Sequence, residues 1–241
     1  MSLVSIITPT FNSEQYIHLT IESVIEQDYE NWELIITDDC STDNTVAIVK
    51  GYVSADERIV LHEFQQNQGA AMARNHSINN SRGEFLAFLD SDDIWNKEKL
   101  KVQVEFMETK GLSFSFTGYE IIDKDGFLTG RTVDTTQNGS FGYKEMLLKK
   151  ATFGCSTVML KVSDFNQKFT MPNLRTGQDY AMWLKILRST GIRAYVIPMS
   201  LVRYRITPNS ISRNKIKKAY RQWSIYRIEE RLGMIQSLFY F

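Results

Sequence analysis

The chain has 241 residues, enough for one large domain or two small ones, and its 43% of hydrophobic residues can form a full core. With 13 Gly, 4 Pro and 23% charged residues, the composition excludes disordered, collagen-like and low-complexity proteins. The sequence has no apolar run long enough to cross a bilayer and no secretory signal at its start, so we expect neither an integral membrane protein nor a secreted one.

The two cysteines indicate a reducing environment. Cys40 and Cys155 are too few for a disulfide framework, and neither has a His or a second Cys nearby at a metal-binding spacing. We interpret both as buried thiols and expect a cytoplasmic protein.

Charge is distributed unevenly although the formal net charge is zero. Residues 200–241 hold nine Lys and Arg against two Glu, so this tail carries +7 and the rest of the chain carries −7. Such a tail fits an anionic membrane surface or a phosphate-bearing partner, while a solvated helix face is the commoner explanation. We expect no nucleic-acid partner, because the acidic body would repel phosphate.

The first half alternates β-rich runs with helical periodicity. Strands are expected at residues 4–8, 32–37, 59–63 and 85–89, and helices at residues 17–25, 45–52 and 70–78. Strands that are apolar on both faces and separated by helices indicate a parallel sheet with helices on each side. The predicted fold class is an open, doubly wound α/β layer.

The second half has a mixed α+β pattern. It begins with a helix near residues 100–107, a strand at residues 112–117 and a hairpin turn at residues 123–126. A mobile loop at residues 132–140 is followed by strands at 157–160, 194–197 and 202–206 and a helix at 180–187. The apolar residues that predict an amphipathic terminal helix are Ile225, Ile228, Leu232, Ile235 and Phe239.

Acidic side chains follow two of the predicted strands. Asp38 and Asp39 follow the second strand, and Asp90, Asp92 and Asp93 follow the fourth. Ligands bind beyond the carboxyl ends of parallel strands, and crowded carboxylates require cations or hydrogen-bond donors. Oxygen ligands two residues apart suit Mg²⁺ or Mn²⁺ with substrate phosphates completing the shell. Neither the dinucleotide fingerprint nor a P-loop is present, so a metal would neutralise those phosphates.

Six motifs occur in order over most of the chain. They are Pro9-Thr10-Phe11-Asn12 with Glu14, Asp38-Asp39-Cys40-Ser41-Thr42-Asp43-Asn44-Thr45, Asn67-Gln68-Gly69 with Ala73-Arg74-Asn75, Asp90-Ser91-Asp92-Asp93, Gly177-Gln178-Asp179-Tyr180 with Trp183-Leu184, and Tyr204-Arg205. Together they resemble the motifs of the family 2 glycosyltransferases, inverting enzymes of the GT-A fold that use nucleotide-sugar donors. The resemblance implies a GT-A-type open, mainly parallel sheet with helices on both faces, a mixed acceptor half and a C-terminal amphipathic helix.

The resemblance also implies roles for single residues. The nucleotide-sugar donor would be bound by Pro9, Glu14, Asp38, Asp39, Arg74, Asp90, Ser91 and Asp92. Asp39 would accept from the uracil imide, and Asp92 would hold the metal. Asp179 would be the catalytic base, and the candidates for sugar or acceptor contacts are Asp93, Gln178 and Trp183.

Three departures from the family pattern affect these expectations. Thr207 stands where many members have His after Tyr-Arg, so we do not expect the second half to supply a metal ligand. Gln178 stands where the family commonly has Glu, which removes a negative neighbour of the expected base. Cys40 replaces the usual Gly, so we expect a backbone that does not need a positive φ there. Without the upstream motifs, Asp179 would be interpreted as an acid favoured at a helix start by the macrodipole.

The expected organisation is one glycosyltransferase domain followed by a helix. Residues 1–212 form the domain, divided into a nucleotide-sugar half (about 1–117) and an acceptor half (about 118–212). Residues 213–241 form the basic amphipathic helix, and its aromatic end suggests a longer natural chain. This helix attaches either to the cytoplasmic membrane face, or to the domain or a second subunit in a homo-oligomer.

The expected function is metal-dependent inverting transfer of a sugar from a nucleotide-diphosphate donor, a uridine one by preference. The acceptor would be a glycan or lipid-linked saccharide in polysaccharide biosynthesis. A catalytically silent nucleotide-sugar-binding or scaffold protein of an envelope-assembly complex remains an alternative, supported by Gln178. An aspartate-nucleophile phosphatase using Asp90 and Asp92 is the second alternative.

Overall fold

Four parallel strands form the first half of a ten-stranded sheet. They are β1 (Val4–Thr10), β2 (Trp32–Asp38), β3 (Ile59–Glu63) and β4 (Phe85–Phe88), in the spatial order β3-β2-β1-β4. The computed structural model describes residues 1–166, 168–207 and 215–241. Strands β1 and β2 are buried at every position, as expected of parallel strands with helices on both faces. The predicted parallel strands are therefore confirmed.

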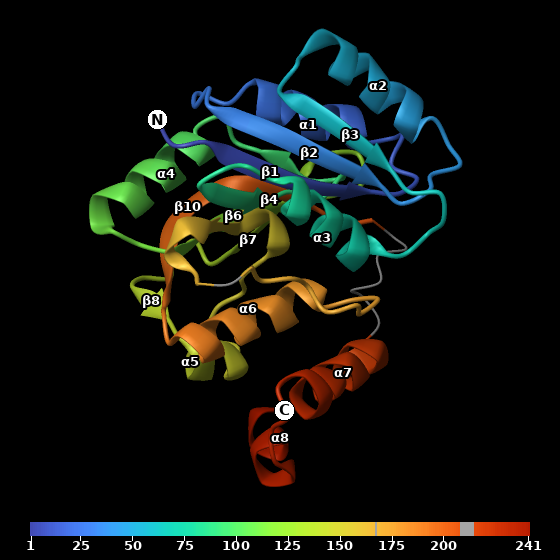
Figure 1. Ribbon diagram of the computed structural model, residues 1–241. Coiled ribbons are helices and arrows are strands. Elements are labelled where there is room, and N and C mark those ends of the chain that lie inside the picture. Colours follow the sequence, from blue (N-terminus) through green and yellow to red (C-terminus); the bar gives the residue numbers. More distant parts are fainter. Residues whose placement is uncertain (167, 208–214) are drawn as a thin grey trace.

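The same sheet continues through the second half. Strand β9 (Val158–Lys161) runs antiparallel between β4 and β6 (Phe114–Ile122), and β10 (Ala194–Arg205) pairs with β6 in parallel. Strand β5 (Ile94–Trp95) completes the order β3-β2-β1-β4-β9-β6-β10-β5. A single sheet thus spans both predicted halves (Figure 1), and the division of the domain at about residue 117 stays a prediction.

Helices cover both faces of the sheet. The helices of one face are α1 (Ile17–Ile25), α2 (Thr45–Ala55) and α4 (Lys99–Lys110), and those of the other are α3 (Ala70–Asn80), α5 (Tyr143–Leu147) and α6 (Gln178–Thr190). Alternation along β4 divides the core, because Phe85 packs with the first group and Phe88 with the second. The predicted fold class is confirmed.

Trp183 belongs to this core. Its side chain is fully buried, and its ring packs edge-on against Phe88 at 5.1 Å and Phe114 at 5.6 Å between centroids. The expected sugar contact of Trp183 does not agree with this position. The predicted helical spacing between Asp179 and Trp183 is correct. Although the helix begins at the site, its apolar face, which carries Trp183, packs into the core.

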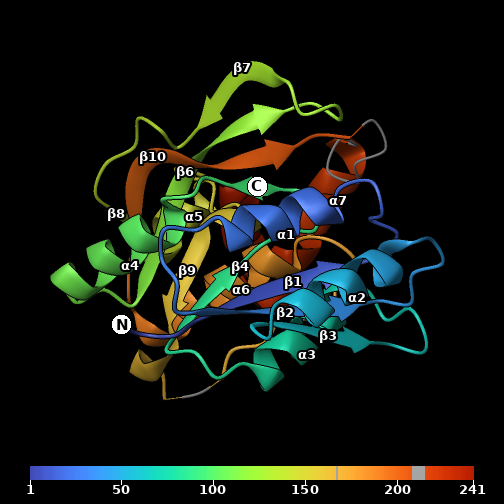
Figure 2. The same cartoon turned by 90° about the horizontal axis from the view of Figure 1, so that it is seen from above.

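Two expectations about the second half were wrong in detail. The expected loop at 132–140 lies partly in strands, because β7 (Leu128–Val133) pairs with β6 and β8 (Ser140–Phe141) pairs with β10. Figure 2 shows the β6–β7 hairpin at the edge of the fold. The two strands expected at 194–197 and 202–206 are one strand, β10, whose register shifts twice near Pro198. A bulge accommodates the missing N–H of proline without ending the strand.

The expected single terminal helix is broken. Helix α7 (Lys215–Ser224) continues into a π-helical turn (Ile225–Glu229), and α8 (Met234–Tyr240) begins after Gly233. Arg231 has a left-handed φ of 52°, which redirects the backbone between the helices. The apolar spacing was helical, but periodicity does not reveal a change of direction. No helix in the described residues is long and apolar enough to cross a membrane.

Lys99 is a buried cation at the start of α4. Its Nζ donates to Gln103 Oε1 at 2.5 Å and lies 4.4 Å from the ring centroid of Trp95. Burial lowers the pKa of Lys99 from 10.5 to about 7. Between these two values the unfolded chain binds more protons than the folded chain, so stability rises with pH.

We predict that Lys99→Met removes this pH dependence. The free energy of unfolding of the wild type, relative to the variant, should rise from pH 7 to pH 10 by at most about 1.4 kcal/mol per pH unit. Urea unfolding at four pH values measures this difference. The control is Lys101→Met at an exposed position. The difference in the free energy of unfolding between the wild type and this control should not change with pH. A difference in stability between the wild type and Lys99→Met that stays constant from pH 7 to pH 10 would contradict the prediction.

Candidate functional site

The carboxyl ends of β1, β2 and β4 meet at one side of the sheet. We call these ends, with the loops that follow them, the polar edge. The loop after β1 is fastened to the loop after β2, because Glu14 Oε2 accepts from Asn44 N at 2.9 Å and Asn12 Oδ1 accepts from Thr42 N at 2.8 Å. Ser91 reaches the first loop, with 2.9 Å between its Oγ and that of Ser13. Residues distant in sequence thus form one surface.

Asp38 and Asp39 lie at the polar edge with their carboxylates engaged. Asp38 accepts from the Ser41 amide at 2.8 Å, and Asp39 accepts from the amides of Gln68 at 2.7 Å and Gly69 at 2.8 Å. Both residues are buried. Each oxygen of Asp39 retains a lone pair for a further donor, because a carboxylate oxygen accepts at two positions. Pro9 is buried in β1, while Glu14 is exposed.

The expectation for Cys40 was wrong. Its φ is 67°, in the left-handed region that favours glycine, and its side chain is half-buried rather than buried. The turn after β2 brings Ser41 back onto the Asp38 carboxylate, and this geometry sets the backbone at residue 40. The family's usual Gly therefore reflects a backbone requirement that this chain meets with a strained cysteine.

The acidic turn Asp90-Ser91-Asp92-Asp93 is fastened from the second half of the chain. Ser156 Oγ donates to Asp93 Oδ2 at 2.6 Å and accepts from Asp90 N at 3.0 Å. Arg205 donates its N–H to Asp93 Oδ1 at 2.9 Å and its Nε–H to the Asp92 carbonyl at 2.9 Å. Asp93 is fully buried. Its expected sugar contact therefore does not agree with its position, and its side chain shapes the turn instead.

A buried guanidinium connects the acidic turn to α6. Arg74 Nη2 donates to Asp90 Oδ1 at 2.5 Å, and its side chain is 6% exposed. Burial opposes the charge of Arg74, but the neighbouring carboxylates of Asp90 and Asp179 raise its pKa. Burial raises the pKa of Cys155 well above its usual value, which leaves a neutral thiol there. Arg74 therefore interacts electrostatically with acids 16 residues and 105 residues further along the chain.

Asp179 stands in the first turn of α6. Burial raises the pKa of its carboxyl, an effect that the charge of Arg74 opposes. Gly177, with φ 76°, precedes the helix because a Cβ there would lie 2.9 Å from Arg221 Cδ of α7. Gln178 is buried next to Asp179, and its Oε1 has no hydrogen-bond partner among the described residues. Helix α7 thus packs against the segment that carries Asp179.

The acidic turn has the donor atoms that a divalent cation requires. Asp92 is half-buried, and burial together with the charge of Asp90 raises its pKa to about 6. In the described part of the chain, no three His, Cys, Asp or Glu side chains are placed to hold a metal between them. Mg²⁺ and Mn²⁺ accept one or two carboxylates when water and phosphate oxygens complete the shell. The turn therefore fits a metal that binds together with a phosphorylated ligand.

Comparison with known proteins gives the family. The profile described as Glycosyl transferase family 2 matches residues 5–167, which is more than half of the chain. The chain belongs to this family. The resemblance drawn from six sequence motifs is thereby confirmed, and the protein is a glycosyltransferase.

Named relatives and one solved structure extend this comparison. TuaG of Bacillus subtilis (strain 168), whose name assigns it to teichuronic acid biosynthesis, is 42% identical over 99% of this chain and 93% of its own. The UDP-Glc:α-D-GlcNAc-diphosphoundecaprenol β-1,3-glucosyltransferase WfgD of Escherichia coli is 40% identical over 92% of this chain and 85% of its own. Crystalline TarS 1–349 of S. aureus with UDP-GlcNAc shares the fold, with a TM-score of 0.75, 21% identity and coverage of 98% of this chain and 69% of its own.

Sequence reasoning on this glycosyltransferase missed three residues of the site. Ser156 and Cys155 lie in a 3₁₀ turn (Cys155–Thr157) before β9, and Arg221 lies on α7. Isolated Ser and Cys residues carry no spacing signal, and Arg221 is one of many basic residues in the tail. Arg205 was noticed only as part of a Tyr-Arg motif. Its two bonds to the acidic turn become visible only when β10 lies beside β5.

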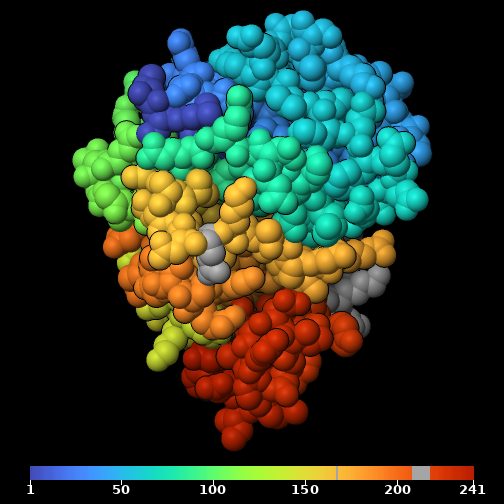
Figure 3. Space-filling view, viewed as in Figure 1, coloured from blue at the N-terminus to red at the C-terminus, as the bar shows by residue number. Residues whose placement is uncertain are grey.

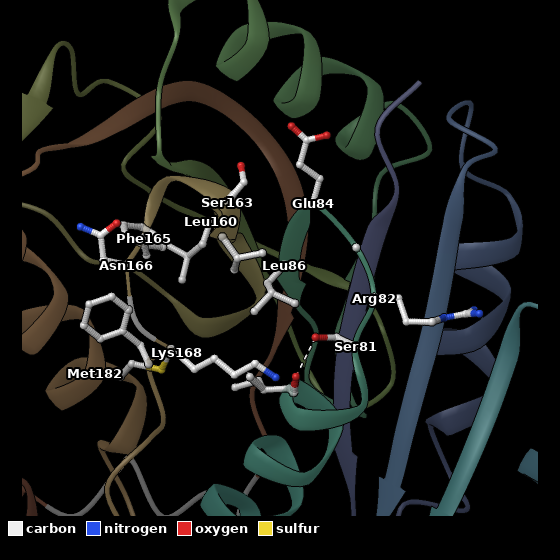
Figure 4. Close-up of a pocket in the computed structure, with 14 residues that line it drawn as sticks. Ser81, Arg82, Glu84, Leu86, Leu160, Ser163, Phe165, Asn166, Lys168 and Met182 are labelled. Atoms are coloured by element: carbon white, nitrogen blue, oxygen red, sulfur yellow. Dashed lines mark hydrogen bonds between the residues drawn. The ribbon is translucent and has the colours of Figure 1, made fainter.

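A cavity of about 600 Å³ lies away from the polar edge. Figure 4 shows Leu86 of β4, Leu160 of β9 and Met182 of α6 around it. Arg82 points away from the cavity and pairs with Glu33 at 2.7 Å. The residues that line the cavity include the connection that precedes β4, whereas the acidic turn follows β4. The cavity therefore lies toward the amino-terminal end of β4, whereas the carboxylates lie beyond its carboxyl end.

We predict that Ser156→Ala destabilises the glycosyltransferase by about 1–3 kcal/mol, because it leaves Asp93 Oδ2 and the Asp90 amide without their shared partner in a buried site. Urea unfolding measures the change in the free energy of unfolding. The exposed Ser163→Ala, at the other side of the sheet, is the matched control and should remain within about 0.5 kcal/mol of the wild type. Equal stability of the two variants would show that the clamp on the acidic turn contributes nothing.

Proposed function

We propose that this glycosyltransferase moves a sugar from a UDP-sugar to a lipid-linked saccharide, with inversion, in the synthesis of a cell-envelope polysaccharide. The observation that carries the proposal is the buried ion pair of Arg74 with Asp90 at 2.5 Å, whose guanidinium charge also acts on the carboxyl of Asp179. It gives the acidic turn and the candidate base one common centre. The names of WfgD and TuaG support the donor, the lipid-linked acceptor and the envelope polymer.

The donor would bind along the polar edge. Pro9, Glu14 and Asp39 surround the proposed nucleoside position, where the free lone pairs of Asp39 can accept the uracil imide N–H. Asp90 and Ser91 would contact the ribose. Arg74 has two buried nitrogens, Nε and Nη1, without a partner among the described residues, and they are suited to anionic or hydroxyl oxygens of the donor.

Asp92 is the proposed holder of Mg²⁺ or Mn²⁺. Its carboxylate is half-buried, and the electrostatic repulsion from Asp90 gives it a strong preference for a positive partner. A bound divalent ion would stabilise the negative charge that develops on the departing nucleoside diphosphate. Asp93, Ser156 and Arg205 hold the turn in place before any ligand binds, so its geometry is preorganised.

Asp179 is the proposed general base. It would take the proton from an acceptor hydroxyl as that oxygen attacks the anomeric carbon opposite the leaving group, and a single displacement inverts this centre. Burial raises its pKa and so makes its carboxylate a stronger proton acceptor, while the charge of Arg74 opposes this rise. Gln178 would contribute an amide oxygen to the acceptor side.

We predict that Asp179→Asn lowers kcat by about 10²–10⁴-fold without changing donor affinity by more than a few-fold, because it removes only the base. A panel of lipid-linked and soluble saccharides with UDP-sugars measures turnover, and calorimetry with UDP measures binding. The exposed Asp125→Asn should behave as the wild type in both assays. Full activity of Asp179→Asn would exclude Asp179 as the base. UDP-sugar binding by the wild type without any turnover would favour a silent binding protein.

We predict that Asp92→Ala abolishes the metal-dependent part of UDP binding. The wild type with Mn²⁺ should gain about 2.7 kcal/mol of stability when UDP is present at about 100 times its Kd. For the variant, the stability gained from UDP should not depend on whether Mn²⁺ is present. Thermal unfolding with UDP, with Mn²⁺ and with both measures these differences. A variant whose UDP binding still responds to Mn²⁺ would move the metal site elsewhere.

The anomeric configuration of the product tests the mechanism separately. An α-linked UDP-sugar should give a β-linked product, which nuclear magnetic resonance couplings distinguish. Retention of configuration would contradict the single displacement. Release of inorganic phosphate from simple phosphomonoesters, which this mechanism does not allow, would favour the phosphatase alternative.

A further inference from the structure

The last elements of the chain project from the rest of the fold. We call residues 215–241, which form α7, the π-helical turn and α8, the terminal arm. In Figures 1 and 3 the arm extends beyond α5 and α6 at the end of the molecule opposite α2. Half of the fourteen exposed large hydrophobic side chains in the described residues lie on it: Tyr220, Ile228, Met234, Ile235, Leu238, Phe239 and Phe241. The arm is therefore the most apolar exposed surface of the described chain.

The apolar side chains of α8 occupy one side of the helix. Ile235 is 84% exposed, Leu238 63% and Phe239 73%, whereas Ser237 is fully buried. Tyr240 lies on the same side as Ser237 and packs against the core. A helix that stabilises its own domain packs its apolar face on the core and turns its polar face to solvent. In α8 this orientation is reversed, because the apolar face points outward and the polar Ser237 points inward.

The arm is held firmly in this orientation. Ile225 and Tyr226 are buried in the core, and Tyr226 Oη donates to the Leu147 carbonyl at 3.0 Å. Buried Glu230 accepts from Arg188 Nε at 2.7 Å and from Tyr143 Oη at 2.8 Å. These contacts hold the π-helical turn and Glu230 on the core, and α8 follows them with its apolar face outward.

Basic side chains lie beside the apolar face on α8 and near it in the chain. Lys149 Nζ donates to the Phe241 carbonyl at 3.0 Å, which places the exposed end of α5 beside α8. Lys149, Lys150 and Arg231 are exposed, and so is Leu148, at 44%. The acid Glu230 is neutralised by Arg188. An apolar surface with a basic rim is complementary to the boundary between lipid headgroups and acyl chains.

We propose that the terminal arm, with the end of α5, docks on an anionic lipid surface. A bilayer offers both apolar depth and negative charge, whereas two copies related by a twofold axis would bring their basic rims together. The inference rests on the proposed function in one respect, the lipid-linked acceptor. Arg221 of α7 packs against Gly177, two residues before Asp179, so docking would bring the proposed base close to the lipid surface.

Vesicle flotation tests the proposal. The full chain is mixed with vesicles of equal parts phosphatidylglycerol and phosphatidylcholine, or of phosphatidylcholine alone. The wild type should float with the anionic vesicles, and the triple variant Ile235→Ser, Leu238→Ser, Phe239→Ser should bind them at least tenfold more weakly. The control, Phe127→Ser with Leu128→Ser, removes two equally exposed apolar side chains from the β7 hairpin and should bind as the wild type. Lys149→Gln with Lys150→Gln should weaken binding to anionic vesicles and leave residual binding to neutral ones unchanged.

Calorimetry with UDP separates this inference from the proposed function. The triple variant should bind UDP as the wild type does, which shows that it is folded. Equal flotation of the triple variant and the control overturns the docking surface. A wild type that does not float, and instead forms dimers that the triple variant abolishes, overturns it in favour of a second copy. Flotation of a wild type that neither binds UDP nor transfers sugar supports the surface and rejects the proposed function.

Discussion

The architecture of the site depends on one buried positive charge. A guanidinium taken out of water is strongly unfavourable unless acids lie near it. Arg74 pairs with Asp90, and the charge of Asp179 also raises its pKa. Asp90 follows a strand of the first half, while Asp179 opens a helix of the second. Correct placement of Arg74 therefore requires both halves to fold together. The same requirement brings the proposed donor and acceptor residues to one place.

The second half of the chain also shapes the turn that the first half supplies. Asp93 follows β4, but its two oxygens accept from Ser156 and Arg205, which come from the ends of β9 and β10. The three aspartates of the turn, if isolated, would repel each other and move. With Asp93 fixed, Asp92 remains beside the surface with a carboxylate that favours a cation. Preorganisation here comes from contacts across the sheet.

The proposed docking of the terminal arm would bring this chemistry to a lipid surface. Its inner side packs on Gly177 and the core, and its outer side carries apolar and basic residues. A polymer-forming transferase whose acceptor is anchored in a lipid layer must bring its base to that layer. An arm that touches the segment carrying Asp179 and also meets lipid would meet this requirement without a membrane-spanning helix.

The sequence by itself determined the parallel strands, their helices, the family and the polar residues at strand ends, because these depend on local periodicity and on motifs of consecutive residues. It could not determine where Trp183 points, why residue 40 needs a left-handed backbone, or that β10 is one bulged strand. It also missed Ser156 and the break before α8. Only the tertiary structure decided these points, because each depends on contacts between residues far apart in the chain, and such contacts leave no pattern in neighbouring residues.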